Sequence, residues 1–159
     1  MLFIGFTSAL ILRRASPDWR SFAAPPLLWG NTVLLLLSTA TLERARRGLR
    51  GWSLASAKLW VGVTGVLGAG FLGGQVLAFR QLAARGVFLS TNPSSSFFYL
   101  LTGVHGVHLL GGLVWFLVIL VRIRRLDLPP GEDGLRLFAT YWHFLAGLWL
   151  YLLFLLFVY

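Results

Sequence analysis

Residues 96–121 read SFFYLLTGVHGVHLLGGLVWFLVILV, and this stretch decides the fold. It carries no Asp, Glu, Lys or Arg from its first residue to its last. A helix needs roughly 20 predominantly apolar residues to cross a hydrocarbon core of about 30 Å. The stretch therefore predicts a transmembrane helix.

Two further segments, residues 59–79 and 137–159, meet the same length, and residues 26–42 do so once extended back to 22. Residues 1–12 reach only about 18 Å before Arg13 and Arg14 intervene. A signal peptide is disfavoured, because no basic segment precedes this stretch and no small-residue cleavage site follows it. We predict one all-α transmembrane domain over residues 1–159, a bundle of five helices with the first one short. The approximate helix bounds are 1–19, 22–42, 57–84, 95–122 and 136–159.

Composition agrees with a membrane protein. The chain is 57% hydrophobic and 12% charged, with a mean hydropathy of +0.78, whereas soluble domains are about 25% charged. A disordered chain is excluded as well, because 15% of the residues are aromatic. There is no cysteine, which excludes disulfides, iron–sulfur clusters and thiolate-bound zinc.

Basic residues outnumber acidic ones by 14 to 5, and they lie in short runs between apolar segments. A nucleic-acid-binding protein would gather them on one presented face, so no nucleic acid is expected as a partner. On the predicted topology five fall on one side of the membrane and nine on the other, and the richer side is expected to be cytoplasmic. This places the N-terminus in the cytoplasm and the C-terminus outside. The richer set is Arg44, Arg46, Arg47, Arg50, Lys58, Arg122, Arg124, Arg125 and Arg136.

Polar residues inside spans are costly and are therefore functional candidates. The strongest here are Gln75, His105, His108 and His143, with Asn31, Thr64 and Thr102 as milder cases. No Asp, Glu or Lys lies within a confident span, which argues against a free-standing transporter.

His105 and His108 are three residues apart and share a helix face, a spacing that could present two imidazoles to a haem or a metal. Helix lengths place His108 about 20 Å and His143 about 9 Å above the cytoplasmic ends of their helices, so the three histidines are not expected to share a layer. Hydrogen bonding within the bundle or to a neighbouring subunit is the favoured interpretation. A haem or metal site stays as the alternative.

Glycines favour close packing of helices in lipid. Gly70 and Gly74, at GxxxG spacing, therefore predict a helix contact. The helices over 57–84 and 95–122 are expected to neighbour each other or a partner. The aromatic start of the last helix, around Trp142 and His143, is either an interfacial belt or a packing surface for a partner or a lipid chain. Arginines at the cytoplasmic end of the fourth helix can bind a lipid phosphate or act as solvated anchors. The lipid-binding candidates are Arg122, Arg125, Trp142 and His143; the packing candidates are Gln75, His105, His108, Gly70 and Gly74.

Three strings bear a family resemblance: QLAARGVFL at 81–89, FFYLLTGVHGVH at 97–108 and YWHF at 141–144. In this order they resemble subunit III of the haem–copper terminal oxidases, in a short five-helix bacterial form. The TGxHGxH and YWHF motifs together are specific, and weaker similarity reaches back through Asn31 and Gln75. Two departures stand out. The last helix reads Leu145-Ala146-Gly147 where the family often has an aspartate. The first shared helix of the family usually bears a buried carboxylate, and this sequence is expected to begin just beyond that position, at Met1-Leu2-Phe3.

The resemblance implies an accessory, non-catalytic subunit of a respiratory oxidase in a bacterial plasma membrane. Haem and copper would reside in partner subunits, and this chain would hold phospholipid, pack directly against subunit I, join subunit II and smaller subunits, and support proton uptake. His105 and His108 would pack within the bundle, Trp142 and His143 would seat the last helix, and Arg122 resembles a lipid-phosphate arginine. The alternatives are a subunit-III-like partner of a nitric oxide reductase and a free-standing haem-binding protein using His105 and His108.

Overall fold

The computed structural model describes residues 2–15, 17, 25–50, 54–90, 93–126 and 132–158. These ranges form five α-helices, and no strand occurs in them. The helices are α1 (Leu2–Arg14), α2 (Pro26–Arg50), α3 (Leu54–Ala84), α4 (Pro93–Leu126) and α5 (Glu132–Leu153), and a π-helical turn η1 (Phe154–Val158) continues α5. The prediction of an all-α bundle of five helices with a short first helix is confirmed.

The helix α2 ends at Arg50, eight residues beyond the expected end at residue 42. Glu43 forms ion pairs with Arg46 at 2.8 Å and Arg47 at 3.8 Å, one turn further along the helix. Such i,i+3 and i,i+4 pairs stabilise helices. Leu42 and Ala45 are fully buried, so the packed face of the helix also continues past the apolar segment.

The helix α3 ends in a Schellman motif. Gly86 has a φ of 74°, a left-handed conformation that costs glycine little. The Val87 N–H donates to the Leu82 carbonyl at 3.0 Å, and the Gly86 N–H donates to the Ala83 carbonyl at 3.0 Å. The following loop is fastened to α4, because the Tyr99 hydroxyl donates to the Val87 carbonyl at 2.8 Å.

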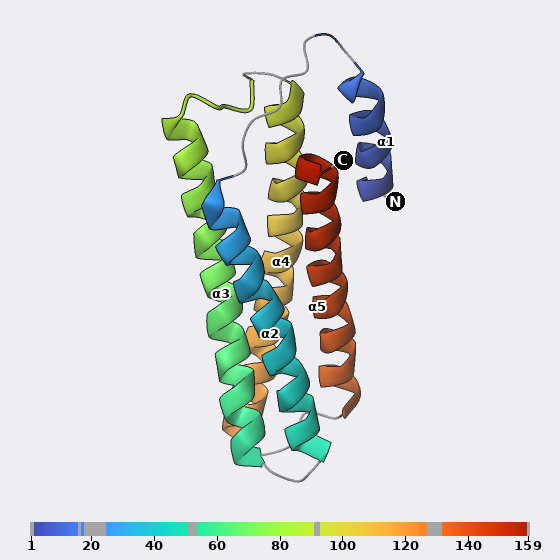
Figure 1. Cartoon of the computed structure of the whole chain (residues 1–159). Helices are drawn as coiled ribbons and strands as arrows, with labels where there is room; N and C mark the ends of the chain where they lie inside the picture. The colour runs from blue at the N-terminus through green and yellow to red at the C-terminus, as the bar shows by residue number, and fades with distance from the viewer. Residues whose placement is uncertain are drawn as a thin grey trace.

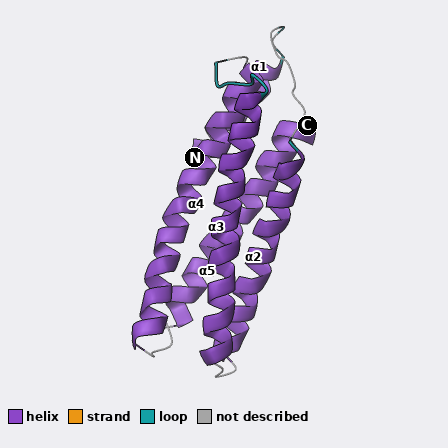
Figure 2. Ribbon diagram, turned by 90° about the vertical axis from the view of Figure 1, so that its left-hand side faces the viewer, coloured by secondary structure: helices purple, strands orange, loops and turns teal. Residues whose placement is uncertain are grey.

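The helices α2 to α5 form an antiparallel four-helix bundle, in which α3 packs most extensively against α2 (Figure 1). The two ribbon views agree on this arrangement (Figure 2). A core of large rings fills the space between the four helices. Its largest buried members are Phe71, Phe98, Phe116, Phe138, Trp142 and Trp149.

The helix α1 lies beside α4 and α5 at the end of the bundle that holds the C-terminus (Figure 1). Leu10 is fully buried there in a second apolar cluster. The Tyr151 hydroxyl donates to the Thr7 hydroxyl at 3.2 Å, and the Arg14 guanidinium donates to the Leu155 carbonyl of η1 at 3.5 Å. The 13 residues of α1 extend about 20 Å, which is less than the thickness of a hydrocarbon core of about 30 Å.

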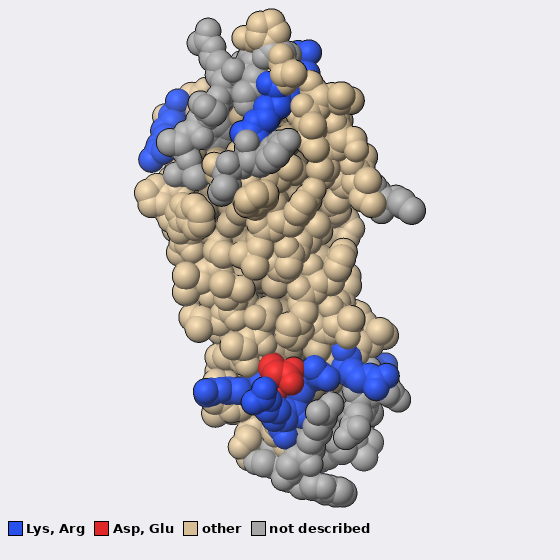
Figure 3. Space-filling model, turned by 45° about the vertical axis from the view of Figure 1, so that its right-hand side comes forward, with Lys and Arg blue, Asp and Glu red and all other residues tan. Residues whose placement is uncertain are grey.

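Within the described ranges, three segments are long and apolar enough to cross a membrane: Ala55–Ala84, Pro93–Arg122 and Gly134–Phe157. A wide band without Lys, Arg, Asp or Glu covers the middle of the visible face, and Lys and Arg side chains lie at both ends of it (Figure 3). Glu43 is paired there with Arg46 and Arg47, near the end of α2. The chain therefore has the surface of a membrane bundle.

Candidate functional site

Two tryptophans of α5 donate hydrogen bonds to hydroxyls of α2. The Trp142 indole N–H donates to the Ser38 hydroxyl at 3.0 Å, and the Trp149 indole N–H donates to the Thr32 hydroxyl at 3.0 Å. All four residues are buried. Trp142 therefore packs within the bundle itself, which differs from both interpretations of the aromatic start of α5, an interfacial belt or a packing surface for a partner or a lipid chain.

His105 lies at the centre of the bundle, enclosed by aromatic rings. Its imidazole stacks on the Trp149 ring, with centroids 5.3 Å apart, and meets the Phe71 ring edge-on at 6.2 Å. Phe71 and Trp149 also contact each other at 5.1 Å. The imidazole is fully buried, so a haem could reach it only by displacing these rings.

Gln75 is the second polar group of this central region. It lies on α3 one turn beyond Phe71 and is 6% exposed. Among the described residues, neither its amide atoms nor the two imidazole nitrogens of His105 have a hydrogen-bond partner. Nearby, the Asn31 amide donates to the Phe71 carbonyl at 2.9 Å.

The other two histidines are exposed. His108 lies beside Phe3 of α1, with ring centroids 5.8 Å apart, so it differs from the expected position inside the bundle. The stack of His105 on Trp149 puts His143 about level with residue 111, about 4.5 Å along the bundle from His108. The expected difference in depth between His108 and His143 is therefore wrong. The estimate was counted from the helix ends, whereas the contacts between α4 and α5 set the register of the two helices.

Each of these two imidazoles contacts a carbonyl of its own helix. His143 contacts the carbonyl of Ala139 on its own helix, and His108 contacts the carbonyl of Val104 on its own helix at 2.8 Å. Among the described residues, no three His, Asp or Glu side chains are grouped so that they could hold a metal ion.

Glycines make room for side chains of neighbouring helices. A Cβ atom at Gly74 would lie 2.1 Å from Oδ1 of the Asn31 side chain, so this glycine allows the close approach of α2 and α3. At Gly70 the nearest atom, on Leu34, would be 3.8 Å away, and Gly70 is exposed. Gly74 thus lies at a contact of α3 with α2, whereas the GxxxG spacing predicts the helix over 95–122 or a partner there, and Gly70 lies at the margin of this contact.

The predicted lipid-binding residues lie in different environments. Arg122 is exposed at the end of an apolar groove of about 400 Å³ on α4, which is also lined by Val114, Leu117, Val118 and Val121. Trp142 is 1% exposed and its ring packs inside the bundle, so the prediction that it contacts lipid is corrected. His143 is exposed, and the side chain of Arg125 lies outside the described residues.

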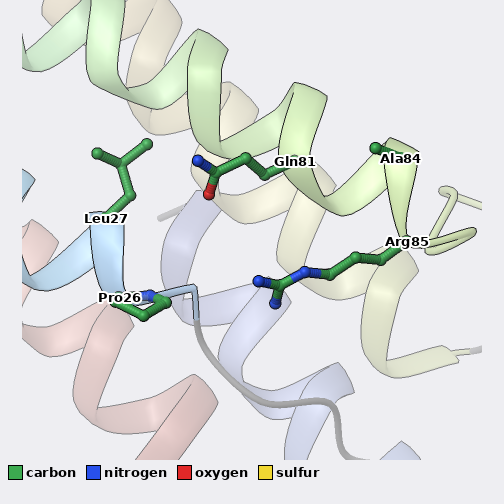
Figure 4. A pocket seen from close by; sticks show the side chains of 5 residues that line it. All are labelled: Pro26, Leu27, Gln81, Ala84 and Arg85. Atoms are coloured by element: carbon green, nitrogen blue, oxygen red, sulfur yellow. The ribbon is translucent and has the colours of Figure 1, made fainter.

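A second hollow, of about 560 Å³, lies at the opposite end of the bundle between the start of α2 and the end of α3 (Figure 4). The Gln81 and Arg85 side chains extend from the end of α3 toward Pro26 and Leu27. Both polar side chains are exposed, so this hollow is an open surface feature.

Sequence reasoning missed several residues of the core. Ser38 was not a candidate, although it accepts the Trp142 bond, because serine is ordinary in membrane helices and its partner is remote in sequence. Gly65 and Gly68 make room for the rings of Phe116 and Trp142, and their spacing carries no signal of this. Only the number of glycines in α3 could have drawn attention to them.

Comparison with known proteins agrees with this architecture. Residues 22–159 match the family model described as cytochrome c oxidase subunit III. The chain is 30% identical to cytochrome c oxidase subunit 3 of Bacillus sp. (strain PS3), an alignment that covers 95% of this chain and 73% of the relative. It is 33% identical to cytochrome c oxidase subunit 3 of Synechocystis sp., covering 99% of this chain and 69% of the relative.

A quinol-oxidising relative is similarly close. The chain is 32% identical to cytochrome bo(3) ubiquinol oxidase subunit 3 of Pseudomonas aeruginosa, over 84% of this chain and 65% of the relative. The match of the family model over most of the chain and the membrane bundle lead to one conclusion. The chain belongs to the cytochrome c oxidase subunit III family.

Proposed function

We propose that this chain is an accessory, non-catalytic subunit III of a proton-pumping terminal oxidase, in which it stabilises the catalytic subunit I. The observation that carries the proposal is the family match over residues 22–159. Haem and copper would reside in partner subunits, with subunit I as the direct neighbour and subunit II and smaller subunits in the same complex. The relatives include oxidases of cytochrome c and of quinol, so the electron donor is set by the partners.

The outer surface of the bundle supports such a partnership. Only 28–39% of the most apolar window of each candidate span is buried inside the molecule. The remainder of each helix is available to lipid or to a neighbouring protein. Large apolar side chains lie on this outer surface, among them Trp29, Leu59, Val66, Val107 and Val114.

The test of the partnership is affinity purification of this chain from its native membrane in mild detergent. We expect co-purification of a haem-bearing subunit I and a copper-bearing subunit II, seen by mass spectrometry and by a reduced-minus-oxidised spectrum. A preparation free of oxidase subunits but with its own haem spectrum would instead favour haem binding by this chain.

We further propose that Arg122 and its groove bind a phospholipid. A guanidinium can bind a phosphate through two parallel hydrogen bonds, and the apolar groove beside it can hold an acyl chain. In the purified complex, Arg122→Ala should lower the amount of bound phospholipid measured by mass spectrometry, with haem content unchanged.

The matched control is Arg47→Ala, which removes the same charge at the same end of the bundle. Arg47 lies on α2, and 77% of its side chain is exposed. Equal lipid loss in both variants would mean that charge alone attracts lipid and that the groove on α4 binds none.

Support of proton uptake is the third part of the proposal. The three candidate spans contain no Asp or Glu, so this chain would act through its effect on subunit I. Removal of the chain should then shorten the active lifetime of the oxidase during turnover, measured as oxygen consumption over time. An unchanged lifetime would contradict this role.

A further inference from the structure

Gln75 and His105 present an unusual combination of burial and missing partners. Four side-chain polar atoms, two on each residue, are buried without a hydrogen bond to any part of the chain that the structure describes. An unsatisfied buried donor or acceptor costs about 1–3 kcal/mol. Native proteins pair nearly all such groups with protein atoms or ordered water.

The two residues converge because α3 and α4 are antiparallel. Phe71 of α3 contacts His105 of α4, and Phe79 of α3 contacts Phe98 of α4 at 6.1 Å. Gln75 lies midway between Phe71 and Phe79 on α3. Along the bundle axis it is therefore within about one helical turn of His105 on α4. Helical side chains tilt toward the N-terminus of their own helix. In antiparallel helices these tilts are opposed, which brings the amide and the imidazole toward each other.

Two side-chain N–H donors of this region already have other acceptors. The Trp149 indole N–H is donated to Thr32, and the Asn31 amide N–H to the Phe71 carbonyl. The faces of Phe71 and Trp149 are apolar. Thr102, one turn from His105 on α4, donates its hydroxyl to the Phe98 carbonyl and keeps an acceptor lone pair.

We propose that a water molecule binds at the centre of the bundle between Gln75 and His105, with Thr102 as a third partner. A neutral imidazole offers one donor and one acceptor, and an amide offers two donors and one acceptor. Water both donates and accepts, and buried waters typically make about three hydrogen bonds to groups that lack other partners. The site links α3 to α4 between the ring contacts of Phe71 with His105 and of Phe79 with Phe98. It goes beyond the accessory role proposed above and does not depend on it.

Direct observation is the first test. The complex in which the chain purifies should be imaged by cryo-electron microscopy at a resolution that shows ordered water. We expect a density peak at hydrogen-bond distance, about 2.7–3.2 Å, from both the Gln75 amide and a His105 nitrogen. A direct Gln75–His105 hydrogen bond with no peak would overturn the proposal, as would two side chains pointing away from each other.

A double-mutant cycle tests the same coupling without density. Gln75→Leu and His105→Phe should each lower the temperature at which the chain dissociates from the purified complex, because each leaves the other group without its bridge. The double variant should lose clearly less than the sum of the two single shifts. Additive shifts would contradict a shared water.

The matched control is His143→Phe combined with Gln75→Leu. His143 is exposed on α5 and contacts only the Ala139 carbonyl of its own helix. The two shifts should therefore add. If the control pair were as non-additive as the test pair, the coupling would reflect general loosening of the bundle and the water bridge would be rejected.

Discussion

Asn31 occupies the space that a side chain at Gly74 would need. Its amide is held by the Phe71 carbonyl, and the residue is 2% exposed, so it has little freedom to move aside. Close approach of helices through small residues is how membrane helices gain packing energy in the absence of a hydrophobic force. The contact of α2 with α3 therefore depends on a single missing methyl group.

Gly74→Ala should destabilise the chain by about 1–3 kcal/mol, the usual cost of overpacking. Gly70→Ala is the control on the same helix, because its nearest atom would be 3.8 Å away. Both changes gain the same helix propensity, so the difference reports the clash. The measurement is the thermal midpoint of the purified complex, and equal midpoints would show that α2 and α3 can separate without penalty.

At this scale the sequence identifies which residues are polar but not which partners they have. Asn31, Thr102 and Gln75 are recognisable because polar side chains are rare in spans. The bonds from Trp142 to Ser38 and from Trp149 to Thr32 join residues that lie far apart in the chain. Such pairings depend on the register of α5 against α2, which no local pattern encodes.

The contact between α2 and α5 is held at two levels by indole hydrogen bonds. Hydrogen bonds between membrane helices average about 0.6 kcal/mol and reach about 1.7 kcal/mol. Ser38→Ala and Trp142→Phe should therefore each destabilise the chain, and the double variant should be more stable than additivity predicts. The measurement is a double-mutant cycle on the thermal midpoint of the complex.

Trp142→Phe with Thr140→Val is the comparison pair for this cycle. Thr140 is exposed and donates only to the Arg136 carbonyl of its own helix. Its shift should add to that of Trp142→Phe. Additive shifts for Ser38 and Trp142 as well would mean that the indole bond contributes nothing measurable.

The helix α1 is held to the rest of the bundle by few contacts, of which Leu10 is the only fully buried side chain among the described residues of that helix. Leu10→Ala should remove about 2–5 kcal/mol of packing, the range for leucine in a core. Local release of α1 should then appear as faster hydrogen exchange over Leu2–Arg14. Leu12→Ala, at a site 79% exposed, should leave this exchange unchanged.

Helix existence is predictable from the sequence here, whereas helix ends are less so. The apolar segments of α3, α4 and α5 are long enough to be recognised by length alone. The end of α2 cannot be recognised in this way, because its last turns are basic. These turns are stabilised by the ion pairs of Glu43 and by the buried side chains of Leu42 and Ala45. Hydropathy reports the hydrocarbon core, while a helix continues into the aqueous phase wherever packing and ion pairs support it.

The whole molecule is polarised along the bundle axis. Exposed basic residues at the end opposite the C-terminus include Arg44, Arg47, Arg122 and Arg136. The positive-inside rule predicts that this end faces the cytoplasm, an orientation that we propose for the chain. Because the chain has no cysteine, single cysteines introduced on a cysteine-free background can report the side directly.

Ser90→Cys and Arg47→Cys lie at opposite ends of the bundle, and both sites are exposed. With a membrane-impermeant maleimide applied to intact cells, we expect labelling at residue 90 and none at residue 47 until the cells are opened. The reverse pattern would invert the proposed orientation.

The small buried share of each spanning helix has a further consequence. Only 28–39% of the most apolar window of each candidate span is buried within the chain, so other molecules surround most of each helix. A thermal midpoint is then a property of the chain together with its detergent, lipid or neighbours, in the same way that a bound ligand shifts apparent stability. Substitutions on the outward faces should be silent when the chain is purified alone in detergent and become measurable only after it has joined its complex.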